Sequence, residues 1–326
     1  MDFFLQGPQW AAFQRDLGRT VHEQSGPGWS FLAVEESNPA GRLLYVPYGP
    51  VAESLEAFDA ALAALTELAR GCGAVFVRIE PARAGFDVSG ADAVLRSRGL
   101  RPAPANQQPE LSWIVDLDRE LKNILADMKP ANRNLYRNIH KKGVTFRSSQ
   151  DPAEISVLLT FLHMTAARNG FKPQSDEYLG QVARSLMPAG AATLFIAELE
   201  GAPIAAALAY DSADTRTYAH AALDDTHRKL SAGIPLLVTL IADAREAGLK
   251  HVDLWGVAPA DQPEHKWAGF TAFKKSFGGR EVAYPGTWDL PVRKVRYGAY
   301  HVARAGAQLA RKSVQALRAR LRRQPG

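Results

Sequence analysis

Four basic residues recur at every fourth position in the run LKNILADMKPANRNLYRNIHKKGV. They are Lys129, Arg133, Arg137 and Lys141. On a helix this spacing places them in one row, about 5 to 6 Å apart, where like charges repel one another. Two interpretations stay open. An anionic partner such as phosphate or RNA would compensate the repulsion, whereas a solvated helix face with acids nearby would give the row no function.

Several other catalytic patterns do not occur in the sequence. There is no nucleophile elbow, no convincing Cys-His pair, and no metal-ligand spacing among the eight histidines. The single cysteine, Cys72, cannot form an internal disulfide or a thiolate zinc site, which favours a reducing compartment. We therefore expect neither covalent catalysis nor a bound metal.

The net charge of +5 is distributed unevenly. No acidic residue follows Asp289, while ten bases do, which leaves 29 basic against 34 acidic residues in the rest of the chain. A mildly acidic body thus carries a strongly basic tail, which argues against a nucleic-acid-binding domain throughout. The tail from Arg293 to Arg323 is helix-prone with an irregular apolar stripe, so we expect peripheral contact with an anionic membrane. The first residues resemble no signal peptide and no apolar stretch is long enough to span a bilayer, so we expect a cytoplasmic protein, peripheral at the inner face of the plasma membrane.

Chain length and hydrophobic patterning predict two domains with the same order of elements. The first copy comprises strands at 29–35 and 43–48, a helix at 55–70, a strand at 74–80 and a helix ending near Gly99. The second comprises three antiparallel strands at 191–198, 204–210 and 217–222, a helix at 234–247, a strand at 250–256 and a helix in FTAFKKSFGG. The fold class is therefore α/β (α+β), with two tandem copies of one unit.

The repeated unit resembles the GNAT N-acyltransferase fold. In that fold an R/Q-x-x-G-x-G/A loop holds a pyrophosphate at the N-terminus of the central helix. Here the loop is Arg228 to Gly233, with Ser231 in place of the first glycine, while YVPYGPVAES in the first copy lacks the pattern. An ordinary helix N-cap at Ser231 is the alternative interpretation.

A more specific resemblance covers roughly residues 8 to 290. The segments MKPANRNLYRNIHKKGV, TAARNGF, VDLWG and WAGFTAFKKSFGG occur in the order found in the Fem family (FemABX) of peptidoglycan-bridge aminoacyltransferases, and QWAAFQ, YVPYGPV and VRIEP also fit. The resemblance implies two tandem GNAT-like domains, at 1–115 plus 285–326 and at 116–284. It also implies that acetyl coenzyme A is not used, so we expect no cofactor. No sustained heptad run occurs between Met128 and Lys275, so we expect no coiled-coil arm.

The activity implied by the resemblance is transfer of an amino acid from aminoacyl-tRNA to a stem-peptide side-chain amine. The acceptor would be a peptidoglycan precursor, either UDP-MurNAc-pentapeptide or lipid II. Lys274 matches a family lysine that faces the ester carbonyl and the terminal ribose of the tRNA, and Phe273 beside it borders the acceptor site or belongs to the core. Lys129, Arg133, Arg137 and Lys141 become candidate tRNA contacts.

Carboxylates end both central strands. The resemblance places Glu80 in the site, where it would orient or deprotonate the amine. Arg78 lies on the same face of that strand, so a structural ion pair with Glu80 is an equal alternative. For Asp253 and Trp255 in VDLWG we expect structural roles, a satisfied carboxylate and a buried indole.

Further residues are implied for binding the precursor. Tyr178 matches a family tyrosine near its phosphates, whereas Gln14, Gln174 and His220 depart from the lysine, base and tyrosine expected at their positions. Arg168 and Arg228 are candidates to compensate for the missing charge, and a solvent-exposed arginine is the alternative for each.

Two other functions remain open. One is an N-acyltransferase of the GNAT superfamily that uses acyl coenzyme A, which the loop at Arg228 to Gly233 would serve. The other is a non-catalytic scaffold that binds RNA or a lipid-linked glycan.

Overall fold

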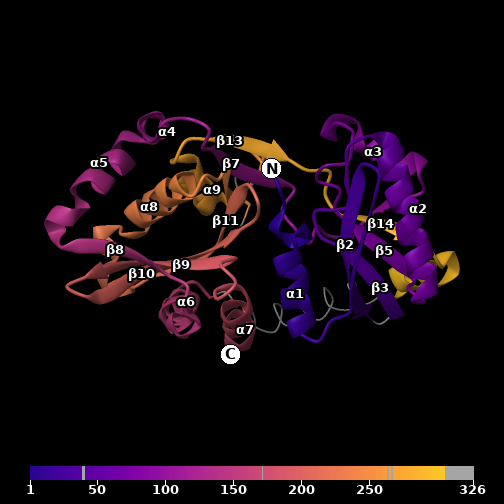
Figure 1. The fold of residues 1–326 in the computed structure, drawn as a ribbon, viewed down its shortest axis with the longest axis horizontal. Coiled ribbons are helices and arrows are strands. Elements are labelled where there is room, and N and C mark those ends of the chain that lie inside the picture. The colour runs from indigo at the N-terminus through magenta and orange to yellow at the C-terminus, as the bar shows by residue number, and fades with distance from the viewer. Residues whose placement is uncertain (39–40, 171, 263, 266, 305–326) are drawn as a thin grey trace, which may run out of the picture. The chain divides into compact units, whose positions relative to one another are not determined.

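The computed structural model describes residues 1–326 except 39–40, 171, 263, 266 and 305–326 (Figure 1). The chain divides into two units, each assembled from separate segments. We call Met1–Val21 with Asn106–Gly286 the large unit, and His22–Ala105 with the chain from Thr287 onward the small unit.

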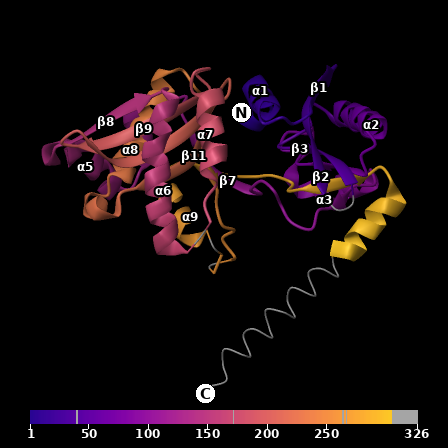
Figure 2. The same cartoon turned by 90° about the horizontal axis from the view of Figure 1, so that it is seen from below.

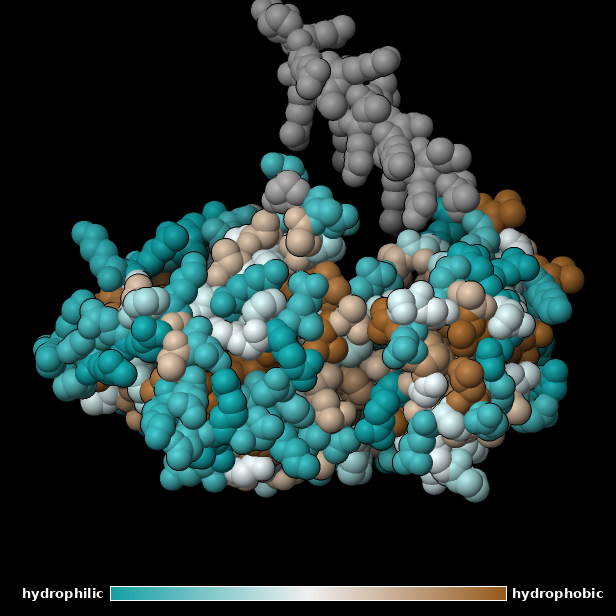
Figure 3. Space-filling model, turned by 90° about the horizontal axis from the view of Figure 1, so that it is seen from above, coloured by the Kyte–Doolittle hydropathy of each residue, from teal (hydrophilic) through white to brown (hydrophobic). Residues whose placement is uncertain are grey.

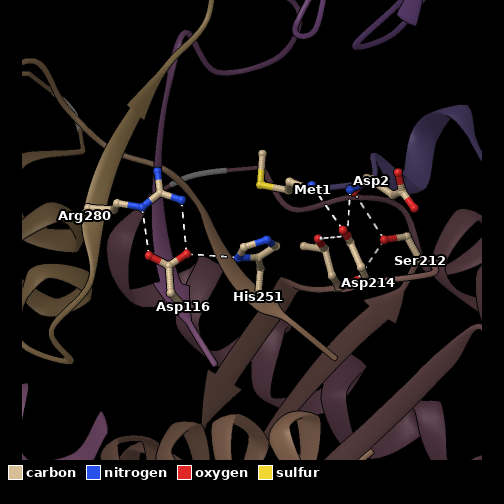
Figure 4. Close-up of polar contacts among 8 residues, drawn as sticks. Met1, Asp2, Asp116, Ser212, Asp214, His251 and Arg280 are labelled. Carbon is tan, nitrogen blue, oxygen red and sulfur yellow. Dashed lines mark hydrogen bonds and ion pairs between the residues drawn. The ribbon is translucent and has the colours of Figure 1, made fainter. Parts of the chain in front are cut away.

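The N-terminal segment belongs to the large unit, whereas the predicted boundaries grouped it with the other domain. The Phe4 ring stacks on Tyr210 with centroids 4.9 Å apart, just before helix α1 (Pro8–Asp16). The backbone N–H of Asp2 donates to Asp214 Oδ1 at 2.7 Å, and the terminal ammonium lies 3.1 Å from Asp214 Oδ2 (Figure 4). Aromatic burial and this anchored terminus explain the assignment, and no sequence pattern near residue 21 marked it.

The sheet of the large unit has the strand order β13-β7-β12-β11-β10-β9-β8. Its strands are β7 (Leu111–Asp116), β8 (Val144–Ser149), β9 (Ala192–Leu199), β10 (Ala202–Asp211), β11 (Thr215–Leu223), β12 (His251–Gly256) and β13 (Arg280–Ala283). Strands β9, β10 and β11 pair antiparallel, as the sequence predicted, and β11 pairs parallel with β12. A parallel pair requires a crossover, which helix α8 (Gly233–Glu246) provides.

Helices cover both faces of this sheet. Helix α8 packs on one face together with α5 (Pro130–Asn138), which follows α4 (Leu121–Asp127), while α6 (Ile155–Asn169) and α7 (Asp176–Leu186) lie on the other (Figures 1 and 2). Leu237, Leu240 and Ile241 of α8 are fully buried among the strand side chains. Helix α9 (Ala268–Lys275) follows β12.

One carboxylate links three neighbouring strands at the edge of this sheet. Asp116 at the end of β7 accepts hydrogen bonds from Arg280 Nε at 2.8 Å and Nη2 at 3.1 Å, and its Oδ1 lies 3.0 Å from His251 Nδ1 (Figure 4). Arg280 begins β13 and His251 begins β12. These contacts help hold the register of β13 and β12 on either side of β7.

The small unit repeats the same arrangement. Its strands are β1 (Val21–Gly26), β2 (Trp29–Asn38), β3 (Gly41–Val46), β4 (Val51–Ala52), β5 (Phe76–Ile79), β6 (Arg101–Pro102) and β14 (Trp288–Pro291), and its helices include α2 (Leu55–Gly71) and α3 (Ala91–Ser97). The main path is β1-β2-β3-β5-β14-β6, with β4 paired to β2. Antiparallel β2 and β3 lead through α2 to β5, which pairs parallel with β3. The predicted α/β class with two tandem copies is confirmed.

Each central parallel strand has its second neighbour from outside its own copy. Strand β5 pairs antiparallel with β14, which follows the second copy, and β12 pairs antiparallel with β7, which precedes it. The sequence analysis assigned no strand at either place. Short pairing segments with little periodicity become strands because a buried neighbour offers free backbone groups.

The described helices bear on two expectations. Between Met128 and Lys275 the longest described helix is α6, with 15 residues, so this part of the structure contains no coiled-coil arm. Among the described residues, no helix has both the length and the hydrophobicity that crossing a bilayer requires. The predicted tail helix is helical over residues 294–304, and its remainder lies outside the described residues.

A buried ion pair attaches β14 to β5. Arg78 Nε and Nη2 donate to the two carboxylate oxygens of Asp289 at 2.7 and 2.9 Å, and the Asp289 side chain is fully buried. The hydroxyl of Tyr297 also donates to Asp289, at 3.1 Å.

We predict that Asp289→Ala lowers the free energy of unfolding of the small unit by about 3 to 5 kcal/mol, because the guanidinium stays buried without its partner. Urea denaturation and amide exchange in β5 would measure the loss. The double variant Arg78→Met/Asp289→Leu should recover most of it, since both charges are gone. A double variant no more stable than the single one would contradict this explanation.

Candidate active site

Lys274 is held at the end of the central strand of the large unit. It lies in the last turn of α9, and its Nζ donates to the carbonyl oxygen of Gly256 at 2.6 Å. Gly256 is the last residue of β12. Burial lowers the pKa of Lys274 to about 8, and the charge of Asp253 opposes that shift. The ammonium form therefore predominates at neutral pH, and its proton is easily released.

Asp253 lies in the same short stretch of β12 and is only 6% exposed. Its Oδ1 accepts the backbone N–H of Trp255 at 2.7 Å. Burial raises the pKa of Asp253 to about 6, against the lowering effects of the Trp255 amide, the Ser112 hydroxyl and Lys274. Between these two pKa values the site holds a buried carboxylate near a partly buried ammonium.

The backbone at this point departs from regular strand geometry. The register between β12 and β7 shifts between Asp253 and Gly256, and Trp255 has a φ of 66°. A left-handed conformation is costly for a residue with a bulky side chain, by about 1 to 3 kcal/mol. The Asp253 carboxylate stabilises it by accepting the Trp255 amide, and the carbonyl of Gly256, directly after the irregularity, accepts the hydrogen bond from Lys274.

Gly256 has a steric reason to be glycine. A Cβ atom there would lie 2.8 Å from side-chain atoms of Pro109 and of Trp267. The end of β12 is thus closely packed around the carbonyl that Lys274 binds.

Phe273 contributes to the core next to this site. Its ring makes an edge contact with Phe277 at 5.0 Å, and Phe277 is fully buried. Phe273 is partly buried against the same cluster. The core alternative therefore describes its contacts in the large unit.

Glu80 lies in the small unit, directly after β5, and is 4% exposed. Its two carboxylate oxygens accept hydrogen bonds from the hydroxyls of Tyr45 and Thr287, each at 2.6 Å. The alternative that Arg78 forms an ion pair with Glu80 is wrong, because Arg78 pairs with Asp289 instead. These two hydroxyl donors orient the Glu80 carboxylate.

A cavity of about 540 Å³ lies on the α6 and α7 side of the large unit. Its described lining residues are Leu162, Lys172, Pro173, Gln174, Ser175 and His220. Burial lowers the pKa of His220 to about 4, so this imidazole is neutral at physiological pH. Lys172 is the only described lining residue that is charged at neutral pH.

Tyr178 and Gln14 lie in the part of the large unit where α1 packs against α7. The Tyr178 ring makes an edge contact with Phe13 at 5.6 Å, and burial raises the pKa of its hydroxyl. Gln14 is 1% exposed, and its Oε1 accepts Arg19 Nη1 at 2.8 Å. Its Nε2 has no hydrogen-bond partner among the described residues. An unpaired buried amide is costly, which makes Gln14 a candidate ligand contact.

The two candidate arginines differ in their partners. Arg168 forms an ion pair with Asp225, the first residue of the 3-10 turn Asp225–Leu230, and its Nε donates to Asn169 at 3.2 Å. Arg228 is exposed within that same turn. Arg168 therefore ties α6 to the loop that precedes α8.

Ser231 occupies the first glycine position of the motif in the loop before α8. Ser231 has φ 51° and ψ 36°, in the left-handed region that glycine favours. Ala232, not Ser231, is the N-cap of α8, and no side chain caps the helix there. The alternative interpretation of the loop, an N-cap at Ser231, is therefore wrong.

The predicted row of four bases is interrupted. Lys129 is the N-cap of α5, and Lys141 lies beyond its end, in the 3-10 turn Ile139–Lys142. The Arg133 guanidinium donates to the carbonyl of Ala126 at 2.7 Å and to that of Met128, so it caps the end of α4. Lys129, Arg137 and Lys141 are exposed. Pro130 explains the break, because it begins a new helix after an extended residue.

Two features of the site were missed by the sequence analysis. Asp253 is the satisfied carboxylate that the sequence analysis expected, since it accepts the Trp255 amide, but the effect of its charge on the pKa of Lys274 was not foreseen. Lys172 was not singled out, although it lines the cavity. The signal that could have indicated this effect of Asp253 on Lys274 was a strand ending in VDLWG followed by a helix ending in FKK. No group of His, Cys, Asp and Glu suited to a metal ion occurs within the described portion.

We predict that Ser231→Gly raises the free energy of unfolding of the large unit by about 0.5 to 1 kcal/mol, because glycine removes the strain of the left-handed backbone. The greater entropy of glycine in the unfolded chain offsets part of this gain. Ser231→Ala keeps the strain and serves as the control. Equal stabilities of the two variants in urea denaturation would argue against strain at this position.

We also predict that Asp253→Asn lowers the pKa of Lys274 below its present value of about 8, because the carboxylate charge now raises it. The pH dependence of Lys274 acylation by a small amine-reactive acylating reagent would measure the change, with the product quantified by peptide mass spectrometry. The inflection should move to lower pH. Acylation of the neighbouring Lys275 should be the same in both proteins, and an unmoved Lys274 inflection would disprove the coupling.

Comparisons with known proteins agree with this architecture. A family model described as an acetyltransferase (GNAT) domain matches residues 127–267, within the large unit. No curated protein matches the chain.

The similar solved structures include FemX, with a TM-score of 0.81 at 19% sequence identity over 90% of this chain and 94% of that chain. The structure of L-PGS from Bacillus licheniformis is similar with a TM-score of 0.56 at 14% identity, over 88% of this chain and 92% of that one. A tandem GNAT protein from the clavulanic acid biosynthesis pathway is similar with a TM-score of 0.51 at 15% identity, over 84% and 83%. The chain therefore has a tandem GNAT fold of the FemX type, with one GNAT-like copy in each unit.

Proposed function

We propose that this protein is a tRNA-dependent aminoacyltransferase that adds an amino acid to a stem-peptide amine of a peptidoglycan precursor. The observation that carries the proposal is the partly buried Lys274 ammonium bound to the end of β12, near Asp253, in a chain with the fold of FemX. The donor is an aminoacyl-tRNA, and the acceptor is a UDP-MurNAc-pentapeptide or lipid II.

The reaction is aminolysis of an ester. The neutral acceptor amine attacks the ester carbonyl, the new C–N bond forms, and the C–O bond to the terminal ribose breaks. The amine gives up a proton, and the ribose oxygen takes one up as it leaves. Because the aminoacyl ester is already activated, alignment of the two substrates supplies much of the acceleration, about 7 to 11 kcal/mol.

Lys274 acts as the hydrogen-bond donor in this proposal. Its ammonium stabilises the negative charge that develops on the carbonyl oxygen or on the leaving ribose oxygen. A pKa of about 8 suits this task, because the group is charged at neutral pH and can transfer its proton readily. Asp253 is a positioning residue, which keeps Lys274 charged despite its burial. Glu80, oriented by Tyr45 and Thr287, is proposed to orient or deprotonate the acceptor amine.

The acceptor is proposed to contact the cavity in the large unit. Tyr178, His220 and Gln14 are the candidate contacts, with Phe273, Arg168 and Arg228 as further candidates. Gln174 and the neutral His220 offer hydrogen bonds, while Lys172 offers the charge. The unpaired Nε2 of Gln14 supports a ligand acceptor atom in that region.

The tRNA is proposed to contact exposed basic residues in and near α5. Lys129, Arg137 and Lys141 are available, whereas Arg133 is already engaged with backbone carbonyls. Phosphate contacts of this kind weaken with added salt, so tRNA binding should depend strongly on ionic strength.

A second candidate is an N-acyltransferase that uses acyl coenzyme A. It is favoured by the match to an acetyltransferase (GNAT) domain and by the left-handed backbone of Ser231, which stands at the first glycine position of the motif. No side chain caps the N-terminus of α8, the end of a helix at which anions bind. Calorimetry separates the two candidates: micromolar binding of coenzyme A, with none of a UDP-linked muropeptide, would favour the second.

We predict that Lys274→Met reduces transfer from charged tRNA by at least about 100-fold, because the oxyanion donor is lost. The assay supplies several charged tRNAs and both precursor forms, and follows radiolabelled amino acid. Lys275→Met is the matched control, since Lys275 pairs with Glu281 at 3.6 Å and lies over the Trp113 ring. It should transfer at the wild-type rate.

Two outcomes would overturn this assignment. Full activity of Lys274→Met would remove the role given to this lysine. Salt-dependent tRNA binding by the wild-type protein without transfer to either precursor would instead indicate a non-catalytic binding protein.

A further inference from the structure

The helical segment at residues 294–304 packs on the small unit through one face only. Tyr297 is 1% exposed and makes an edge contact with Phe76 at 5.3 Å. Tyr300 stacks on the same ring at 5.5 Å, and the Tyr297 hydroxyl donates to the buried Asp289. These contacts fix the rotation of the segment about its own axis, and so they determine which side chains point outward.

The opposite face of the segment is apolar and open to solvent. Val295 is 88% exposed and Val302 is 74% exposed, the two highest values among the exposed large hydrophobic residues of the described chain. Ala299 lies between them and is also exposed. A spacing of four and then three residues places all three in one stripe, at about 100° of rotation per residue. Hydrophobic side chains stand out at the surface of the molecule in the space-filling view (Figure 3).

The residues around this stripe are basic. Arg293, Lys294 and Arg296 are exposed, and Lys294 and Arg296 lie on either side of Val295. No acidic residue occurs after Asp289, and the sequence beyond residue 304 adds six more bases. The segment therefore combines an outward apolar stripe with flanking side chains that are all positively charged.

This combination selects among the possible partners. RNA would compensate the charges but has no aliphatic surface for two exposed valines. A second copy of the segment would cover the valines but would bring like charges together. An anionic bilayer offers both an apolar layer and negative headgroups, and basic amphipathic helices bind there with the apolar face inserted at the acyl boundary.

We propose that residues 294–304 begin a membrane-surface helix, which attaches the protein to anionic lipid through Val295, Ala299 and Val302. The bases beside the stripe attract the headgroups, and the tyrosine face stays on the small unit. The attachment requires neither tRNA nor an acceptor, so it is independent of the proposed transfer reaction.

The test is sedimentation of the full-length protein with phosphatidylcholine vesicles that do or do not contain phosphatidylglycerol. The wild type should bind only the anionic vesicles. The affinity of Val295→Ser/Val302→Ser for these vesicles should fall by at least about fivefold, because the apolar contact is removed while every charge remains. Val88→Ser is the control, because Val88 is another exposed valine of the small unit, at 40%. Unchanged thermal unfolding of both variants shows that the fold is retained.

A second variant tests the charges. Lys294→Gln/Arg296→Gln should also weaken binding and should reduce its dependence on salt. Equal vesicle binding by wild type and Val295→Ser/Val302→Ser, or no binding by the wild type, would overturn the proposal. The proposal would also fail if the serine variant lost tRNA binding but kept vesicle binding. It would fail likewise if the wild type sedimented as a dimer and the serine variant as a monomer, with no change in vesicle binding.

Discussion

Each unit of this protein depends on how it compensates a charge buried on its central parallel strand. Strand β5 places Arg78 in the interior of the small unit, and Asp289 neutralises it through two hydrogen bonds. Strand β12 places Asp253 in the interior of the large unit, where a backbone amide and the charge of Lys274 stabilise it. An uncompensated charge at either place would cost several kcal/mol.

The two solutions have different consequences. In the small unit the partner carboxylate belongs to β14. The charge pair therefore joins two strands that are far apart in sequence, and its role is structural. In the large unit the compensation is incomplete: burial raises the pKa of Asp253 to about 6 and lowers that of Lys274 to about 8. A carboxyl and an ammonium group with pKa values on either side of neutrality suit proton transfer, and such shifted values are frequent at catalytic sites. The same repeated unit thus yields one structural and one candidate catalytic centre.

The cavity and the tail extend this pattern of divided roles. The cavity in the large unit offers mostly neutral hydrogen-bonding groups, with Lys172 as its described charge. The basic tail begins on the small unit, where two tyrosines hold one face of the segment and leave two valines exposed on the other. The net charge of +5 therefore describes neither region well, since it averages a mildly acidic body and a basic end.

The sequence by itself determined the repeated order of strands and helices, because hydrophobic periodicity reflects burial on each element separately. It also marked Lys274 and the glycine-like loop at Ser231. Only the tertiary structure decided the partners. Arg78 and Glu80 share a strand face, yet Arg78 pairs with Asp289 and Glu80 with two hydroxyls, since segments far apart in sequence supply them. Arg133 matched the spacing of a binding row but caps α4, because Pro130 starts a new helix at that point. Spacing along the chain reports neighbours on one element, whereas contacts between elements follow from how the sheets and helices pack.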